Sequence, residues 1–116
     1  MSEGKGAYRI ALGTANTGGG VASALNPEAA DLIITDFVID VTTAPTGAAL
    51  TADAGIAATA TGSDNTLIAA ADLSAVGMVA SGNPVEWPSG EYLTVSRTAG
   101  GAAGLVGYAY VKYVRK

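Results

Sequence analysis

The most regular run of apolar and polar positions lies in residues 31–43 and predicts one long β-strand. Successive side chains of a strand point to opposite faces, so the residues of this run divide into two sets. β-branched residues are frequent in both sets, which favours a strand over a helix. The set without charge is expected to face the core: Ile33, Thr35, Phe37, Ile39 and Val41. The set with two carboxylates is expected to be at least partly in water: Leu32, Ile34, Asp36, Val38 and Asp40.

Weaker alternation predicts further strands at residues 7–12, 21–25, 48–60, 91–97 and 105–115. The secondary structure of two short segments is not decided by the pattern. Residues 67–73 fit a strand or a helical turn, and residues 26–30 fit one helical turn or a plain turn. Residues rich in Gly, Pro, Asn and Ser predict the connections, at 13–20, 44–47, 62–65, 80–89 and 98–104.

This spacing of short strands predicts an all-β protein, an antiparallel β-sandwich that is jelly-roll-like and has little or no helix. A parallel α/β fold would need helices of about 10–15 residues between the strands, and the pattern contains none. Residues 1–6 are polar and contain glycine, which predicts a flexible N-terminal arm. Residues 7–116 are expected to form a single β-sandwich domain.

The composition of the chain limits the classes of function that are expected. The chain has 116 residues, of which 49% are hydrophobic and 14% charged, so a folded core is expected. Much of that core must be alanine, which buries little apolar area and so favours association of several chains.

The formal net charge is −4 and the six Lys and Arg form no basic stripe, so we expect no nucleic-acid partner. No run of 18 apolar residues predicts a membrane span, and the N-terminal residues lack the apolar stretch of a signal peptide, so cytoplasmic synthesis is expected.

The usual equipment for catalysis is missing from the sequence. There is no His and no Cys, and Lys5 and Lys112 lack the apolar neighbours that would lower a lysine pKa. Asp36 and Asp40 share one face of a strand about 13 Å apart, too far for a pair of glycosidase carboxylates. The glycine-rich residues 13–20 lack the Lys and Ser/Thr of a phosphate-binding loop. We therefore predict no enzymatic activity, no catalytic residue, no cofactor and no metal site.

The aromatic residues offer two readings. In a carbohydrate-binding module, such rings would stack on a sugar, whereas in an assembly protein they would pack in the core or between subunits. Because aromatic residues are so few, the second reading is favoured. The interface candidates are Lys5, Trp87, Tyr92, Tyr108, Tyr110 and Tyr113.

Five stretches of the chain carry a resemblance to a known protein family. The longest reads GGGVASALNPEAADLIITDFVIDVTTAPTG and covers residues 18–47. The others are DAGIA, DNTLI, PSGEYLTVS and AGLVGYAYVKY, at residues 53–57, 64–68, 88–96 and 103–113. Together these stretches resemble small head proteins of tailed bacteriophages.

This resemblance, to capsid decoration (cement) proteins and jelly-roll head or fibre modules, implies a β-sandwich that oligomerises. It implies a structural virion protein that binds the major capsid protein on the outside of a phage head and stabilises the head. A homotrimer is favoured over a dimer, with the arm at residues 1–6 reaching a neighbouring subunit or the shell. A receptor- or carbohydrate-binding module of a phage fibre or head spike is the alternative function.

Overall fold

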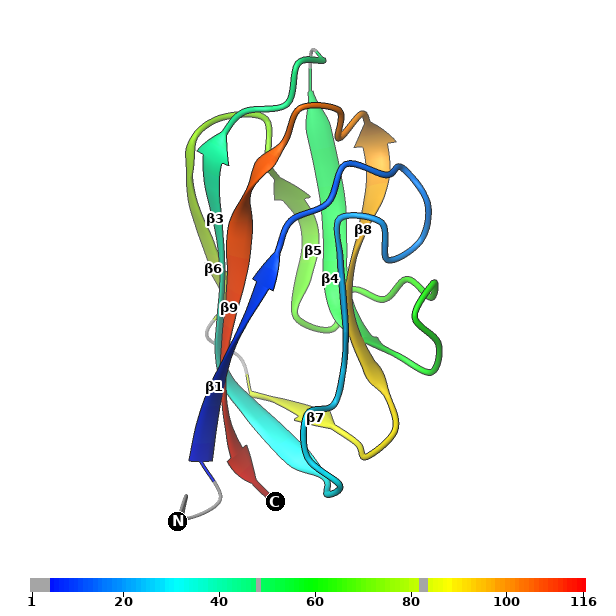
Figure 1. Ribbon diagram of the computed structural model, residues 1–116, viewed down its shortest axis with the longest axis vertical. Coiled ribbons are helices and arrows are strands. Elements are labelled where there is room, and N and C mark those ends of the chain that lie inside the picture. The colour runs from blue at the N-terminus through cyan, green and yellow to red at the C-terminus, as the bar shows by residue number, and fades with distance from the viewer. Residues whose placement is uncertain (1–4, 48, 82–83) are drawn as a thin grey trace.

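The computed structural model describes residues 5–47, 49–81 and 84–116. These residues form nine strands and no helix, in two antiparallel sheets that face each other (Figure 1). The strands are β1 (Lys5–Ala11), β2 (Ala22–Leu25), β3 (Leu32–Thr43), β4 (Leu50–Ala57), β5 (Ile68–Asp72), β6 (Gly77–Ser81), β7 (Val85–Trp87), β8 (Tyr92–Gly100) and β9 (Val106–Arg115). The predicted all-β sandwich is confirmed.

The strand order is that of a jelly roll. Sheet A has the order β1-β9-β3-β6, with the short β7 also paired to β3, and sheet B has the order β2-β8-β4-β5. Strands from the two halves of the chain pair in nested fashion: β1 with β9, β2 with β8, β3 with β6, and β4 with β5. The chain is therefore one long antiparallel hairpin that has rolled up, as in jelly-roll domains.

The central strand β3 changes face in its middle, and this corrects the expected division of residues 31–43. Ile34 pairs with Tyr113 of β9 and Asp36 with the preceding residue, Lys112, so Thr35 is an extra residue in a β-bulge. The Thr35 hydroxyl donates to the Lys112 carbonyl at 3.3 Å. Before the bulge Leu32 and Ile34 are buried; after it the buried residues are Phe37, Ile39 and Val41. The expectation that Ile33 and Thr35 face the core is wrong, because one inserted residue reverses the alternation.

Three other expectations need adjustment. Residues 80–89, expected to be a loop, contain the end of β6 and all of β7, because both strands pair along one edge of β3. Residues 98–104, expected to be a turn, begin with the last residues of β8, which pair with β4 up to Gly100. The strand β1 starts at Lys5, so residues 5 and 6 belong to the sandwich, and the rest of the expected arm lies outside the described residues.

The structure assigns the two short segments whose secondary structure the pattern did not decide. Residues 68–72 form a strand in which Ala70 has a φ of 54°, and the Asp53 carboxylate accepts a hydrogen bond from its backbone N–H at 2.8 Å. Residues 26–30 form a plain turn without helix. Asn26 holds this turn, because its side-chain oxygen accepts from the Glu28 N–H at 2.8 Å. Its amide group donates to the carbonyls of Ala30, Trp87 and Pro88.

The core between the sheets contains small and medium-sized side chains around two fully buried aromatic residues, Phe37 and Trp87. Alanine contributes Ala22, Ala52, Ala54, Ala71, Ala102 and Ala109 to this core, as the composition indicated. Such a core buries less apolar area per residue than a leucine-rich one, so each large buried side chain matters more to stability.

Candidate interaction surface

The outer faces of the two sheets differ. Sheet B is covered on its outer side by residues 58–66, which form most of the connection from β4 to β5, together with the loop between β1 and β2. Ser96, on the outer side of β8, is 1% exposed; its hydroxyl accepts from the Gly19 N–H at 2.8 Å and donates to the Gly62 carbonyl at 3.3 Å. Ser23 of β2 donates to the Ala60 carbonyl at 3.0 Å. These contacts leave the outer face of sheet A as the less covered sheet face.

Register places the side chains of that face in rows across the sheet, and three of these rows cross its middle. Each of the three runs from β1 through β9 to β3, and the first two continue onto β6. Residues directly opposite in antiparallel strands share a face, so each row forms a line of neighbours. The rows are Ala11-Tyr108-Asp40-Met78, Arg9-Tyr110-Val38-Ala80 and Ala7-Lys112-Asp36.

The outer face of sheet A is partly apolar. Tyr110 is 41% exposed and Met78 is 74% exposed, and Val106, which follows the same alternation along β9, is 50% exposed. They are three of the six large hydrophobic side chains that are exposed among the described residues. Large apolar side chains gathered on one face are typical of surfaces that contact another protein.

The charges of this face are separated by sign. The cations Arg9 and Lys112 lie on β1 and β9, and the carboxylates Asp36 and Asp40 lie on β3. The Arg9 guanidinium lies 4.4 Å from the centre of the Tyr108 ring, a cation–π contact that holds it above β9. The rings of Tyr108 and Tyr110 are 6.2 Å apart. One half of the face is thus cationic and aromatic, and the other half is anionic and aliphatic.

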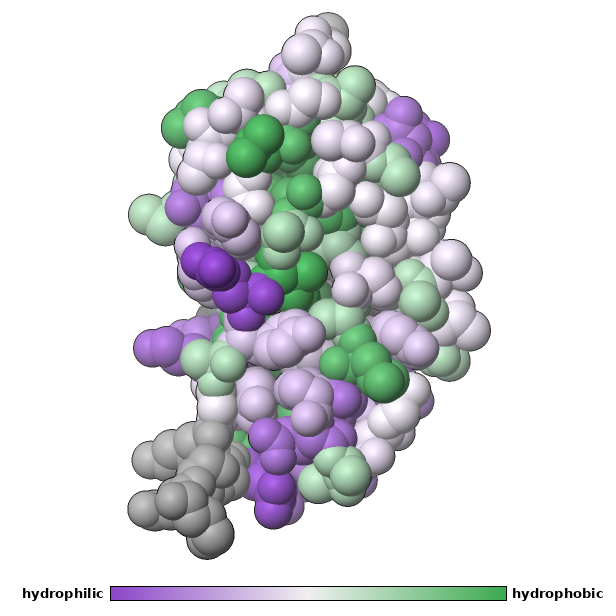
Figure 2. All heavy atoms as spheres, in the orientation of Figure 1, coloured by the Kyte–Doolittle hydropathy of each residue, from purple (hydrophilic) through white to green (hydrophobic). Residues whose placement is uncertain are grey.

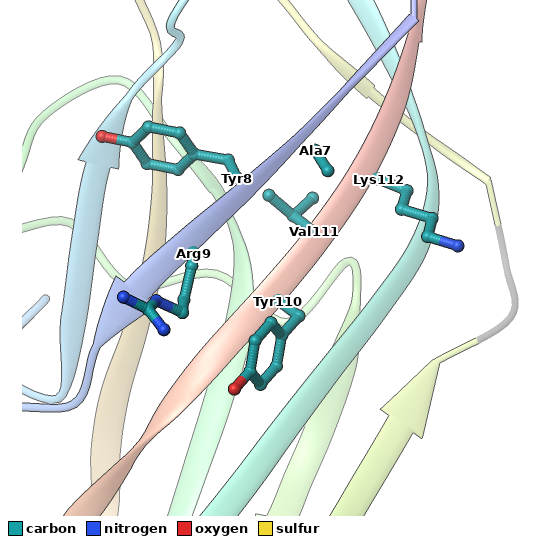
Figure 3. A pocket seen from close by; sticks show the side chains of 6 residues that line it. All are labelled: Ala7, Tyr8, Arg9, Tyr110, Val111 and Lys112. Atoms are coloured by element: carbon teal, nitrogen blue, oxygen red, sulfur yellow. The ribbon is translucent and has the colours of Figure 1, made fainter.

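A shallow hollow of about 220 Å³ lies along β1 and β9 (Figure 3). Its lining residues are Ala7, Tyr8, Arg9, Tyr110, Val111 and Lys112. Binding sites for small organic ligands usually measure about 300–1,000 Å³ and enclose the ligand. The hollow is smaller and open, which is better suited to receiving one side chain of a partner protein.

The sandwich is also open along one edge. Figure 2, in which the sheets are seen from the side, shows hydrophobic residues along the line between β1 and the strands of sheet B. Tyr8, on the inner side of β1, is 39% exposed there, because β2 is too short to cover the whole of β1.

The expected interface residues separate into two groups. Trp87 is completely buried: its ring meets that of Tyr113 edge-on at 6.4 Å, and its indole N–H donates to the Glu91 carbonyl at 2.9 Å. Tyr113 is 7% exposed. Placing these two residues at a subunit interface is therefore wrong for their side chains, because both point into the core of the sandwich.

The other candidates remain near the surface. Tyr108 and Tyr110 lie on the outer face of sheet A, and Tyr92 is half-buried at the start of β8. Lys5 opens β1, and its side chain lies outside the described residues. Arg9 was missed as a candidate, although the alternation of residues 7–12 already placed it on the polar side of β1.

Electrostatic contacts near the C-terminal end of β9 are local. The Tyr113 hydroxyl donates to Glu28 at 3.2 Å, and Arg115 forms an ion pair with the same carboxylate at 2.9 Å. Burial, followed by the hydrogen bond and charge of Glu28, raises the pKa of Tyr113. Lys116 pairs with Glu86 at 3.0 Å, and this hydrogen bond raises the pKa of Lys116.

Within the described ranges, no group of three or more acidic, His or Cys side chains is arranged to hold a metal ion. No helix long and apolar enough to cross a membrane occurs in that part of the chain either.

The chain matches no protein-family model, no curated protein and no solved structure. The fold and the outer face of sheet A are thus the structural grounds on which a function can be argued.

Proposed function

We propose that this chain is a structural protein of a phage head, a decoration protein that binds the outside of the shell through the major capsid protein and acts as a homo-oligomer. The observation that carries the proposal is the outer face of sheet A, a largely uncovered sheet surface with exposed Tyr110 and Met78. Jelly-roll domains are common in viral capsids, and the five stretches that resemble small phage head proteins point the same way.

Such a protein acts through thermodynamic linkage between its own binding and the form of the shell. A protein that binds only the expanded form of a shell stabilises that form by mass action, without any chemistry of its own. A jelly roll with separated surface charges is suited to this role. Contacts repeated over many copies add up even when each one is weak.

Co-sedimentation tests this function. The purified chain is mixed with empty heads, in the unexpanded and the expanded form, of the phage that carries its gene. We expect the chain to pellet with expanded heads and to raise the temperature at which they break. A chain that stays in the supernatant with both forms would overturn the proposal.

The alternative function, a receptor- or carbohydrate-binding module, depended mainly on Trp87. A sugar-stacking role for Trp87 requires an accessible ring, and the Trp87 ring is 0% exposed. The open hollow beside Tyr110 offers little enclosure for a sugar. Glycan-array binding by the wild-type chain that is lost in Tyr110→Ala would favour the alternative in place of the decoration function.

A further inference from the structure

We propose that the outer face of sheet A binds the same face of a second copy of this chain, around a two-fold axis that lies between β9 and β3 and runs parallel to them. The inference deepens the proposed function by naming the partner at this face. It rests on the proposed function in one respect, which is that this face contacts another protein. The pairing of two copies is measured in solution without phage heads, so it can fail independently of the proposed function.

A two-fold axis restricts which residues of the two copies can meet. In a two-fold contact the same surface is used by both copies, and residue i of one meets residue j of the other and the reverse. Rotation about an axis in the plane of the face, parallel to the strands, keeps each row at its own height and reverses the order of the strands. The partner's β3 then lies over β9, and the partner's β6 lies over β1.

This rotation brings opposite charges together. In the third row, Lys112 on β9 comes to lie over Asp36 of the second copy. In the first row, the second copy's Asp40 comes to lie over Tyr108, where the Arg9 guanidinium is already held by its contact with the ring. The symmetry repeats both pairs, so the contact contains four attractions between unlike charges and places no two like charges directly opposite each other in these rows.

The same rotation matches side-chain sizes. In the middle row Tyr110, the most exposed tyrosine, meets Val38 of the second copy close to the axis. Met78 at the edge of the sheet meets Ala11, and the stem of Arg9 meets Ala80. Large side chains thus face small ones, which allows two sheets to approach to the usual distance of about 10 Å.

The size of the face sets the expected affinity. Four strands about 4.8 Å apart and rows that span about 14 Å along a strand give a flat area of a few hundred Å². A standard stable interface buries about 800 Å² from each partner. We therefore expect a weak dimer, with a dissociation constant of about 10–100 μM, that becomes weaker as salt screens the four charge pairs.

The resemblance to phage head proteins favoured a trimer over a dimer, whereas the separation of charge on this face favours a dimer. Sedimentation equilibrium distinguishes them. At about 500 μM chain and low salt, at least about five times the expected dissociation constant, we expect a weight-average mass of about 1.7–1.9 times the chain mass of 11.4 kDa. A mass that stays at one chain, or a trimer, at this concentration would overturn the inference.

Two complementary variants test the geometry. Arg9→Glu with Lys112→Glu makes the charges of these rows all acidic, and Asp36→Lys with Asp40→Lys makes them all basic. Each variant alone should associate at least 100-fold more weakly than the wild type, because like charges then face each other. An equimolar mixture of the two should form a heterodimer. Failure of the mixture to associate would overturn the inference even if each variant alone is monomeric.

Two controls separate this contact from general effects. Ala58→Glu and Ala58→Lys change the charge of the exposed connection over sheet B and should leave the dimer unchanged. Circular dichroism checks the fold of every variant. If a double variant does not fold, the single variants Lys112→Glu and Asp36→Lys, both at exposed positions, are mixed instead, with the same two outcomes.

Discussion

Replacing Trp87 by alanine gives the most direct test of how this small-residue core is stabilised. Trp87 is the one tryptophan of the chain, and its ring is 0% exposed although it lies on β7, a strand of three residues. A buried tryptophan removes about 150–250 Å² from water, which at ~25 cal/mol per Å² corresponds to about 4–6 kcal/mol. The alanine that remains retains a small part of this, and the surrounding chain relaxes only partly.

We therefore expect Trp87→Ala to lower the free energy of unfolding by about 3–5 kcal/mol. For a domain of this size, that corresponds to a fall in Tm of roughly 10–20 °C. Trp87→Phe keeps a ring and loses the 2.9 Å hydrogen bond to the Glu91 carbonyl, so it should cost about 1–2 kcal/mol. The matched surface variant Tyr110→Ala should stay within about 0.5 kcal/mol when measured at low protein concentration.

Urea unfolding followed by far-ultraviolet circular dichroism measures all three, since the fluorescence of Trp87 is lost with the residue. The assignment of Trp87 to the core and Tyr110 to the surface would be refuted if Trp87→Ala lowered the free energy of unfolding by less than about 1 kcal/mol and Tyr110→Ala lowered it by more than that.

Three further predictions concern single contacts. Asn26→Ala should cost about 2–4 kcal/mol in urea unfolding, because three carbonyls lose their side-chain donor, and Asn26→Asp should cost more, because a carboxylate would then face those carbonyls. Gly107→Ala should destabilise the protein by more than about 2 kcal/mol, because an added Cβ would overlap the Asp40 carbonyl in β3, and a thermal scan that shows no loss would contradict this. The pKa of Tyr113 is raised in the folded state, so its contribution to stability is full below about pH 10 and is lost as the pH rises through the folded pKa. Unfolding measured from pH 8 to 11 should show a smaller alkaline loss in Tyr113→Phe, and an equal loss would contradict the role of this hydroxyl.

The fold class and most strands were predictable from the sequence, because side-chain alternation and turn residues act locally. Residues 105–115 illustrate this: alternation puts Tyr108 and Tyr110 on one face of the strand and Val111 and Tyr113 on the other, and the structure shows that the second face is the buried one. The long strand 31–43 was also recognised, together with the carboxylates Asp36 and Asp40 that now define the anionic half of the outer face of sheet A.

What only the tertiary structure decided depends on pairing between distant residues. The bulge at Thr35 exists because β9 lies beside β3, and no local pattern reveals it. The sequence left open whether Trp87 packs in the core or between subunits, and the pairing of β7 with β3 decides it by turning the ring towards Tyr113. The separation of charge on sheet A likewise arises only when β1 and β9 lie next to β3, since register across strands is set by contacts far apart in the chain.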